Sequence, residues 1–215
     1  MEKITVLITD DHTLVRESWA MILDADPRFK VVGQCGSGEE ALELVESLRP
    51  NVVIMDINLP GMTGLHATTD ISRSVPASKV LVVSLHTRPV YVRKLMQSGA
   101  FGYVTKNSSQ DELMHAIEEV HHGRKYICEE IKNILAEQAI TGEKDEPGLH
   151  ALSKRELNII SFLKNGLSSK EIAENISVSV KTVEVHRYNI LRKLNLPNVA
   201  ALVNYVNHSQ MAAEF

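Results

Sequence analysis

The sequence predicts an α/β protein: a doubly wound, five-stranded parallel sheet followed by a small all-α domain that contains a helix-turn-helix. Two observations lead to this fold class. Five short apolar runs alternate with helical patterns over roughly the first 120 residues, as in parallel sheets whose two faces are covered by helices. After a polar, breaker-rich stretch at 141–148, only helical patterns remain, and a short one and a longer one are separated by a tight turn.

The five predicted strands are apolar runs rich in β-branched residues, a composition typical of strands buried on both faces. The central run, 52–55, ends at Asp56, and the pair Pro60-Gly61 breaks the chain shortly afterwards. The predicted strands are 4–9, 30–35, 52–55, 80–83 and 102–104.

Several helix starts are indicated by the pattern Ser-x-x-Glu, in which the serine hydroxyl accepts a hydrogen bond from the backbone N–H three residues later. The pattern begins at Ser37, Ser109, Ser153 and Ser168. Together with the apolar periodicity, it predicts helices over 12–23, 38–48, 64–74, 89–98, 110–121, 154–165, 169–175 and 180–194, and a last one after Pro197.

Charge divides the chain into two parts. Residues 1–148 carry 15 Lys and Arg against 22 Asp and Glu, a net −7, whereas residues 149–215 carry 8 against 5, a net +3. A basic rear part is compatible with nucleic acid, although an excess of this size also arises by chance. We expect a first domain at 1–123, a linker at 124–148 with a helix over 126–138, and a helix-turn-helix domain at 149–215.

The composition, with 44% hydrophobic and 23% charged residues, is that of a globular protein. No apolar run has the length of a membrane span, and the N-terminus lacks the basic-then-apolar pattern of a signal peptide. The sequence therefore predicts a cytoplasmic protein with no membrane partner. Cys35 and Cys128 lie far apart without metal-ligand spacing, which favours small buried thiols.

Polar side chains follow the predicted strands at their carboxyl ends, where open α/β sheets bind ligands. These residues are Asp10, Asp11, Asp56, Ser84 and Lys106. Three carboxylates at one edge repel one another unless a cation lies among them. Because all three are oxygen donors and no His/Cys set has zinc-like spacing, Mg²⁺ is the expected ion.

A carboxylate beside Mg²⁺ can accept a phosphoryl group and become an aspartyl phosphate. Lys106 supplies the positive charge that such a group needs, and the Ser84 hydroxyl can donate a hydrogen bond to it. Taken alone, Asp56 could simply cap a turn and Lys106 could be solvated. The five residues together favour the phosphoryl site.

Residues 1 to about 123 resemble the receiver domain of two-component response regulators, which has a flavodoxin-like fold. The resemblance is carried by Asp10-Asp11, Asp56, Pro60-Gly61, Ser84, Tyr103 and Lys106, in this order. It implies that Asp56 is phosphorylated, by a histidine kinase or a small phosphodonor. The metal ligands that it implies are Asp10, Asp11, Asp56 and the backbone carbonyl of Asn58.

The same resemblance implies that Ser84 and Tyr103 form a switch, in which the hydroxyl moves toward the phosphoryl group and the aromatic ring turns inward. Leu85 stands where many receivers have a smaller residue, so we expect it to narrow access to Asp56. Asn58 and His86 occupy positions that tune the phosphoryl lifetime in the family, and the direction of their effect is left open.

Residues 149 to about 212 resemble the LuxR-type DNA-binding domain, most specifically in the run Lys-Thr-Val-Glu-Val-His at 181–186. Both resemblances together imply a response regulator of the NarL/FixJ type. In the helix over 180–194, Val183, Ile190 and Leu194 follow an inward stripe.

The opposite face of that helix is expected to enter the major groove of double-stranded DNA. Glu184 can accept from cytosine N4, Val185 can touch a thymine methyl group and Asn189 can reach a base edge or a phosphate, and Tyr188 projects the same way. The expected phosphate contacts are Lys170, Lys181, Thr182, Arg187, Arg192 and Lys193. For each of these side chains, the alternative is a solvated surface residue.

These features favour a transcription regulator that is phosphorylated on Asp56 and forms a homodimer when phosphorylated or bound to DNA. The last helix offers a dimer surface, or else part of its own domain's core, through Val199, Leu202, Val203 and Val206. One alternative is a constitutive DNA-binding protein whose receiver is only a dimerisation scaffold. A phosphatase of the haloacid-dehalogenase type is disfavoured because Asn58 stands where its general acid would be.

Overall fold

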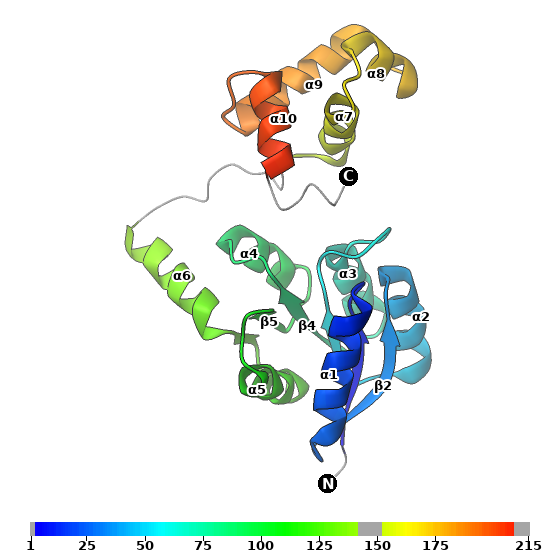
Figure 1. The fold of residues 1–215 in the computed structure, drawn as a ribbon, viewed down its shortest axis with the longest axis vertical. Coiled ribbons are helices and arrows are strands. Elements are labelled where there is room, and N and C mark those ends of the chain that lie inside the picture. The colour runs from blue at the N-terminus through cyan, green and yellow to red at the C-terminus, as the bar shows by residue number, and fades with distance from the viewer. Residues whose placement is uncertain (1–2, 142–151, 209–215) are drawn as a thin grey trace. The chain divides into compact units, whose positions relative to one another are not determined.

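The computed structural model describes residues 3–141 and 152–208 (Figure 1). The chain divides into two compact units, Met1–Asp145 and Glu146–Phe215. Each unit has a hydrophobic core of its own. No helix in the described part is long and apolar enough to cross a membrane.

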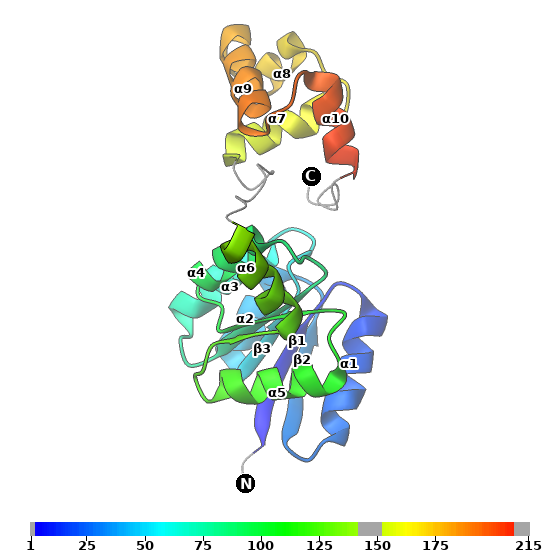
Figure 2. The same ribbon diagram turned by 90° about the vertical axis from the view of Figure 1, so that its left-hand side faces the viewer.

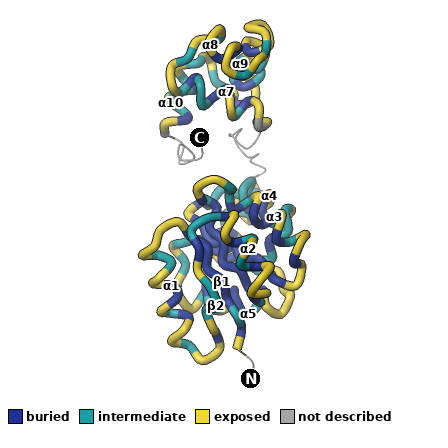
Figure 3. The backbone as a smooth tube through the Cα atoms, turned by 90° about the vertical axis from the view of Figure 1, so that its right-hand side faces the viewer, coloured by how far each residue is buried: buried dark blue, intermediate teal, exposed yellow. Residues whose placement is uncertain are grey.

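The first unit is a parallel sheet with the strand order β2-β1-β3-β4-β5-β6. Helices pack on both faces of the sheet, and α1 and α2 lie on opposite sides of β1 and β2 (Figure 3). The strands are β1 (Ile4–Thr9), β2 (Phe29–Cys35), β3 (Val52–Met55), β4 (Lys79–Ser84), β5 (Gly102–Thr105) and β6 (Tyr126–Ile127). The helices are α1 (Thr13–Ala25), α2 (Gly38–Leu48), α3 (Gly64–Ser74), α4 (Pro89–Gln97), α5 (Gln110–His121) and α6 (Glu129–Thr141).

The predicted fold class is confirmed, and its five strands are all present. Strands β3 and β5 are buried at every residue, as expected for strands covered by helices on both faces. The sheet gains a sixth strand, β6, because the Tyr126 amide donates to the Phe101 carbonyl and the Cys128 amide to the Tyr103 carbonyl. Two paired residues are too few to produce an apolar period in a sequence, so β6 was not predicted.

The segment expected to be a linker differs from the prediction in its first part. Instead of one helix over 126–138, it forms β6 and then α6, and both pack on the first unit. Ile131 is fully buried in the core, and Ile134 and Leu135 pack against it. Helix α6 lies beside α4, where Arg93 donates a hydrogen bond to Gln138 (Figure 2). The apolar stripe of α6 therefore attaches this segment to the sheet rather than leaving it free.

The four serine caps are confirmed, since each hydroxyl accepts from the amide three residues later. The reciprocal hydrogen bond of a capping box runs from the backbone amide of the serine to the glutamate side chain. Among the four caps, it forms only at Ser153 and Ser168. In α5, Glu112 instead accepts from the Glu129 amide at 3.0 Å and from the Tyr126 hydroxyl at 3.3 Å. The start of α5 is thereby joined to β6 and α6. Both cysteines are buried thiols, as expected.

The second unit is all-helical in its described residues: α7 (Lys154–Lys164), α8 (Ser169–Asn175), α9 (Val180–Lys193) and α10 (Val199–His208). Val183, Ile190 and Leu194 are buried, which confirms the inward stripe of α9. Leu202 and Val206 of α10 are also buried, so these two belong to the domain core rather than to a free dimer surface.

Candidate functional site

Four neighbouring strands deliver the predicted polar residues to one edge of the sheet. Asp10 follows β1, Asp56 follows β3, Ser84 ends β4, and Lys106 comes directly after the last residue of β5. Since these strands are parallel and adjacent, their carboxyl ends meet. The loop after Asp56 turns so closely that a Cβ at Gly64 would lie 1.9 Å from the Asp56 carbonyl oxygen, which explains the glycine there.

Lys106 links the two buried carboxylates of this edge. Its Nζ lies 2.7 Å from Oδ2 of Asp10 and 2.7 Å from Oδ2 of Asp56. Asp10 and Asp56 are only 5% and 3% exposed. Such a charge-assisted pair of hydrogen bonds fixes the lysine between the two strands.

Burial and charge act in opposite directions on these groups. Burial raises the pKa of Asp56, and the Lys106 ammonium only partly offsets this effect. For Lys106, burial disfavours the ammonium, but the hydrogen bonds to Asp10 and Asp56 outweigh it and raise the pKa. Lys106 therefore stays cationic. A further positive charge near Asp56 would favour the ionised form of its carboxyl group.

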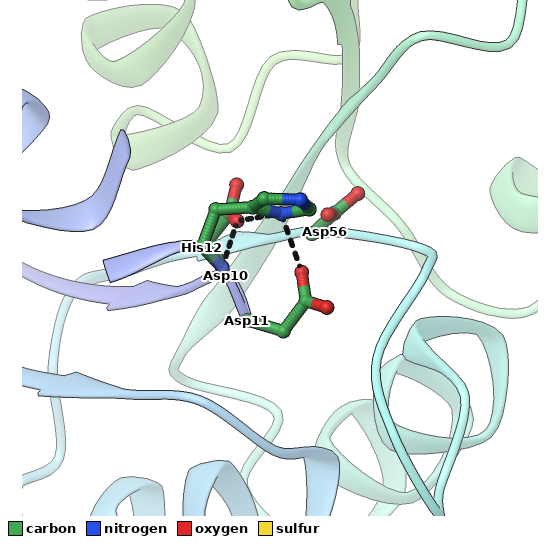
Figure 4. Close-up of side chains that lie close together, drawn as sticks. All are labelled: Asp10, Asp11, His12 and Asp56. Carbon is green, nitrogen blue, oxygen red and sulfur yellow. Dashed lines mark hydrogen bonds and ion pairs between the residues drawn. The ribbon is translucent and has the colours of Figure 1, made fainter. Parts of the chain in front are cut away.

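Asp11 and His12 complete a cluster at this edge (Figure 4). One potential ligand atom from each of Asp10, Asp11, His12 and Asp56 can be chosen so that all four lie within 4.8 Å of one another. The His12 Nδ1 lies 2.7 Å from Oδ1 of Asp11 and 3.3 Å from Oδ1 of Asp10. His12 was not predicted to belong to the site, although its place directly after two aspartates was the available signal.

Asn58 contacts Asp56 through its backbone amide and His86 through its side chain. The amides of Ile57 and Asn58 donate to Oδ1 of Asp56 at 2.7 and 3.4 Å. The Asn58 side-chain oxygen lies 3.4 Å from Nε2 of His86. That the Asn58 carbonyl is a metal ligand stays a prediction.

The two residues of the predicted switch both contact the backbone of His86. The Ser84 hydroxyl accepts from the His86 amide at 3.2 Å. Tyr103 is fully buried and donates from its hydroxyl to the His86 carbonyl at 2.6 Å, and burial raises its pKa. The tyrosine ring thus faces inward in this structure.

Leu85 and His86 differ sharply in their surroundings. Leu85 exposes 55% of its surface, whereas His86 exposes 7% and stacks on Tyr91 with ring centroids 5.2 Å apart. Burial lowers the pKa of His86, although the nearby Asp56 carboxylate opposes this shift. His86 is thus buried near Asn58 and Asp56, and the effect of Leu85 on access to Asp56 stays a prediction.

In the second unit, most of the predicted DNA contacts form an exposed face. These exposed residues are Lys170, Lys181, Thr182, Glu184, Val185, Tyr188, Arg192 and Lys193, while Arg187 and Asn189 are half-buried. Val185 and Tyr188 expose 52% and 65% of their surfaces, unusually high values for large apolar and aromatic side chains.

Two of the predicted phosphate contacts are engaged within the domain itself. Nζ of Lys193 lies 2.8 Å from Oε2 of Glu156, a carboxylate that is only 4% exposed. Arg187 donates a hydrogen bond to the hydroxyl of Ser169 in α8. These two side chains therefore hold α9 against the rest of the unit.

Comparisons with known proteins place both units in families. Residues 6–118 match the response regulator receiver domain, and residues 150–206 match the luxR family of bacterial regulatory proteins. The response regulator UvrY of Escherichia coli (strain K12) is 37% identical over 212 residues, 98% of this chain and 97% of UvrY. The oxygen regulatory protein NreC of Staphylococcus epidermidis is 37% identical over 207 residues, 93% of this chain and 95% of NreC.

Solved structures share the fold over nearly the whole chain. RcsB of Salmonella typhimurium matches with a TM-score of 0.62 at 24% identity, covering 96% of this chain and 99% of that chain. A structure of two RcsB dimers bound to two parallel DNAs matches with a TM-score of 0.60 at 23% identity, covering 97% and 100%. The family matches and the full-length relatives together show that this chain belongs to the NarL/FixJ-type response regulators, which join a receiver domain to a LuxR-type DNA-binding domain.

Proposed function

We propose that this response regulator is a transcription regulator in which a histidine kinase phosphorylates Asp56 and thereby controls DNA binding through α9. The observation that carries the proposal is the pair of 2.7 Å contacts from Lys106 to Asp10 and Asp56 at a buried sheet edge. A lysine held there is ready to contact a phosphoryl group on Asp56. The cytoplasmic location expected from the sequence stays a prediction.

The donor set of the site fits Mg²⁺. Asp10, Asp11 and Asp56 offer carboxylate oxygens that approach one another within a few ångströms, and the Asn58 carbonyl would complete the set. When bound, Mg²⁺ neutralises the charge of the phosphoryl oxygens during the transfer.

The transfer itself uses groups of this chain. A carboxylate oxygen of Asp56 attacks the phosphorus of a phosphohistidine, the P–N bond breaks, and the imidazole nitrogen keeps the electron pair. Lys106 donates a hydrogen bond to Oδ2 of Asp56 in this structure. After the transfer it would donate that hydrogen bond to a phosphoryl oxygen instead. The Ser84 hydroxyl, at the end of the adjacent strand, would donate to another.

A route from the site to α6 begins at β5. Tyr103 is held inward by its hydrogen bond to the His86 carbonyl, and its own carbonyl accepts from the Cys128 amide just before α6. Movement of Ser84 and Tyr103 on phosphorylation would therefore reach β6 and α6 directly. We infer that the phosphorylated form binds double-stranded DNA as a homodimer, by analogy with the DNA-bound RcsB dimers.

Intact-mass analysis after incubation with acetyl phosphate, with and without Mg²⁺, tests the first step. We expect one added phosphoryl group on the wild type with Mg²⁺ only, and none on Asp56→Ala. If no adduct forms, beryllium fluoride, a stable mimic of the phosphoryl group, should still change the fluorescence of Trp19 when it is added together with Mg²⁺. An unchanged fluorescence would contradict the phosphoacceptor role. If the affinity for DNA is the same with and without phosphorylation of Asp56, the alternative of a constitutive DNA-binding protein is favoured instead.

A further inference from the structure

Glu39 lies in the first turn of α2, yet its carboxylate contacts the loop that joins β3 to α3. Its Oε1 accepts a hydrogen bond from the Met62 amide at 2.9 Å, across 23 positions of the chain. The start of α2 is already capped, because the Ser37 hydroxyl accepts from the Glu40 amide. Helix capping therefore does not explain why this exposed glutamate turns toward the loop.

Two glycines allow the first turn of α2 and the loop to approach each other closely. Gly61 has a φ of +74°, a left-handed conformation that favours glycine, and a Cβ there would lie 2.8 Å from Oε1 of Glu39. On the helix side, a Cβ at Gly38 would lie 2.7 Å from the Met62 carbonyl oxygen. The contact between Glu39 and the loop thus depends on the absence of a side chain at both positions.

The tip of this loop, residues 60–62, has few other hydrogen bonds. The two ends of the loop are fastened at Ile57, whose carbonyl accepts from the Leu59 and Gly64 amides at 3.2 and 3.0 Å. Between these ends, the bond to Glu39 is the only hydrogen bond that joins the tip to another element in the part of the chain that the structure describes. Removing this bond should therefore increase the conformational freedom of the loop.

Asn58 connects the loop to the phosphoryl chemistry. Its amide lies 3.4 Å from Oδ1 of Asp56, and its carbonyl would complete the oxygen donors for Mg²⁺. Mg²⁺ demands near-ideal octahedral geometry, so a backbone carbonyl serves it best when the loop holds that carbonyl in one place. Groups that orient metal ligands without touching the ion accordingly contribute to its affinity.

We propose that Glu39 is a positioning residue for the Mg²⁺ site beside Asp56: by holding the Met62 amide, it fixes the loop after β3 and keeps the Asn58 carbonyl in place. The inference rests on the proposed function and adds to it a residue that touches neither the cation nor the phosphoryl group. Glu39 acts on the affinity for Mg²⁺ rather than on the transfer, because the contact of Lys106 with Asp56 does not involve the loop tip.

The test measures Mg²⁺ binding to the full-length, unphosphorylated protein by NMR titration, for wild type, Glu39→Ala, Glu39→Gln and Glu43→Ala. Glu39→Gln removes the charge but keeps a side-chain oxygen that can accept from the Met62 amide. Glu43→Ala is the charge control, because Glu43 is an exposed glutamate of the same helix whose side chain makes no hydrogen bond or ion pair with the described residues. Glu39→Ala should fold normally, since the Glu39 side chain is exposed.

We expect Glu39→Ala to weaken Mg²⁺ binding by about tenfold, the lower end of what losing an outer partner of a metal site costs. It should also speed exchange of the Met62 amide in the metal-free protein. Glu39→Gln should stay within about threefold of the wild-type Mg²⁺ affinity, because the charge it removes is exposed and screened by salt. Glu43→Ala should change neither the affinity nor the exchange. At saturating Mg²⁺, acetyl phosphate should label Asp56 at the wild-type rate in all variants.

Three results would overturn the inference. The first is a wild-type Mg²⁺ affinity in Glu39→Ala. The second is an equal loss of affinity in Glu39→Ala and Glu39→Gln, which would assign the effect to charge rather than to the hydrogen bond. The third is slow labelling of Glu39→Ala that saturating Mg²⁺ does not restore, which would place the role of Glu39 in the transfer or in the fold.

This inference and the proposed function fail in different ways. Normal Mg²⁺-dependent labelling of wild-type Asp56, together with an unchanged Mg²⁺ affinity in Glu39→Ala, removes the positioning role and leaves the proposed function intact. A Mg²⁺ affinity that depends on Glu39, in a chain that acetyl phosphate never labels and beryllium fluoride never affects, supports the positioning role and removes the phosphoacceptor function.

Discussion

The ion pair between Lys193 and Glu156 leads to a prediction that separates packing from DNA contact. Glu156 is 4% exposed and accepts from Lys193 at 2.8 Å, from the Ser153 amide at 2.7 Å and from the Ser153 hydroxyl at 2.9 Å. Lys193→Met keeps most of the side-chain length but leaves the buried carboxylate without its cation. Arg192→Met is the control, because Arg192 is exposed and its side chain makes no hydrogen bond or ion pair with the described residues.

Breaking a buried ion pair costs about 3–5 kcal/mol when one partner is removed. Two features reduce this value here: the Lys193 side chain is 38% exposed, and Ser153 keeps two hydrogen bonds to the carboxylate. We therefore expect Lys193→Met to lower the free energy of unfolding of the second unit by about 1–2 kcal/mol. Arg192→Met should stay within about 0.5 kcal/mol of wild type.

Urea denaturation followed by two signals measures this difference. The chain has one tryptophan, Trp19 in α1, so its fluorescence reports the first unit, whereas far-UV circular dichroism also follows the helices of the second. Lys193→Met should shift only the dichroism transition. In DNA binding, Arg192→Met should reduce the salt slope by about 1 and Lys193→Met should leave it unchanged.

The loss of stability in Lys193→Met should depend on pH in a definite direction. Burial would raise the pKa of Glu156, but the hydrogen bonds from Lys193 and Ser153 outweigh it and lower the pKa below 4.5. A carboxyl with a lowered folded-state pKa stabilises the fold above its unfolded value and loses this contribution as the pH falls through the folded value. The difference between Lys193→Met and wild type should therefore shrink below pH 4.5. An unshifted dichroism transition together with a smaller salt slope in Lys193→Met would refute the packing role.

The remaining predictions concern the sheet edge, α6 and the exposed face of α9. Lys106→Met should abolish acetyl phosphate labelling of Asp56, measured by intact mass, since it removes the cation 2.7 Å from Oδ2. Gly64→Ala should destabilise the first unit by about 1–3 kcal/mol in Trp19-monitored urea denaturation, because a Cβ there meets the Asp56 carbonyl at 1.9 Å; wild-type stability would contradict this close approach. Thr105→Val removes the 2.7 Å hydrogen bond to Glu130 and should speed amide exchange in α6 more than in α5. Val185→Ala should lower the affinity for a selected DNA operator, and this loss should be smaller when uracil, which lacks the methyl group, replaces the thymines of the operator. Equal losses of affinity on both DNAs would exclude a contact with a thymine methyl group.

Much of the acidic site was predictable because it lies where predicted strands end. Once the apolar runs place Asp10, Asp56, Ser84 and Lys106 at carboxyl ends of parallel strands, the topology brings them to one edge without further information. The serine caps were equally predictable, because a cap depends on residues only three apart.

The partners of the surrounding side chains were not predictable in the same way. The sequence marks Lys193 as one more basic residue of a DNA-facing helix, and only the packing of α9 on α7 brings it to the buried Glu156, 37 residues away. Likewise, no pattern in the sequence indicated that the loop after β4 buries His86 and leaves Leu85 exposed. Contacts between residues distant in the chain depend on how elements pack, which no local pattern encodes.

The sequence by itself determined the strands, the capped helices, the acidic sheet edge and the inward stripe of α9, because each depends on local periodicity or on strand order. The tertiary structure alone decided that β6 and α6 join the first unit, where the short strand pairs with β5 and Ile131 enters the core. It also decided that the loop after β4 buries His86 and leaves Leu85 exposed. Pairing of a two-residue strand and the aim of a single side chain are set by neighbouring elements, so they become visible only in the folded chain.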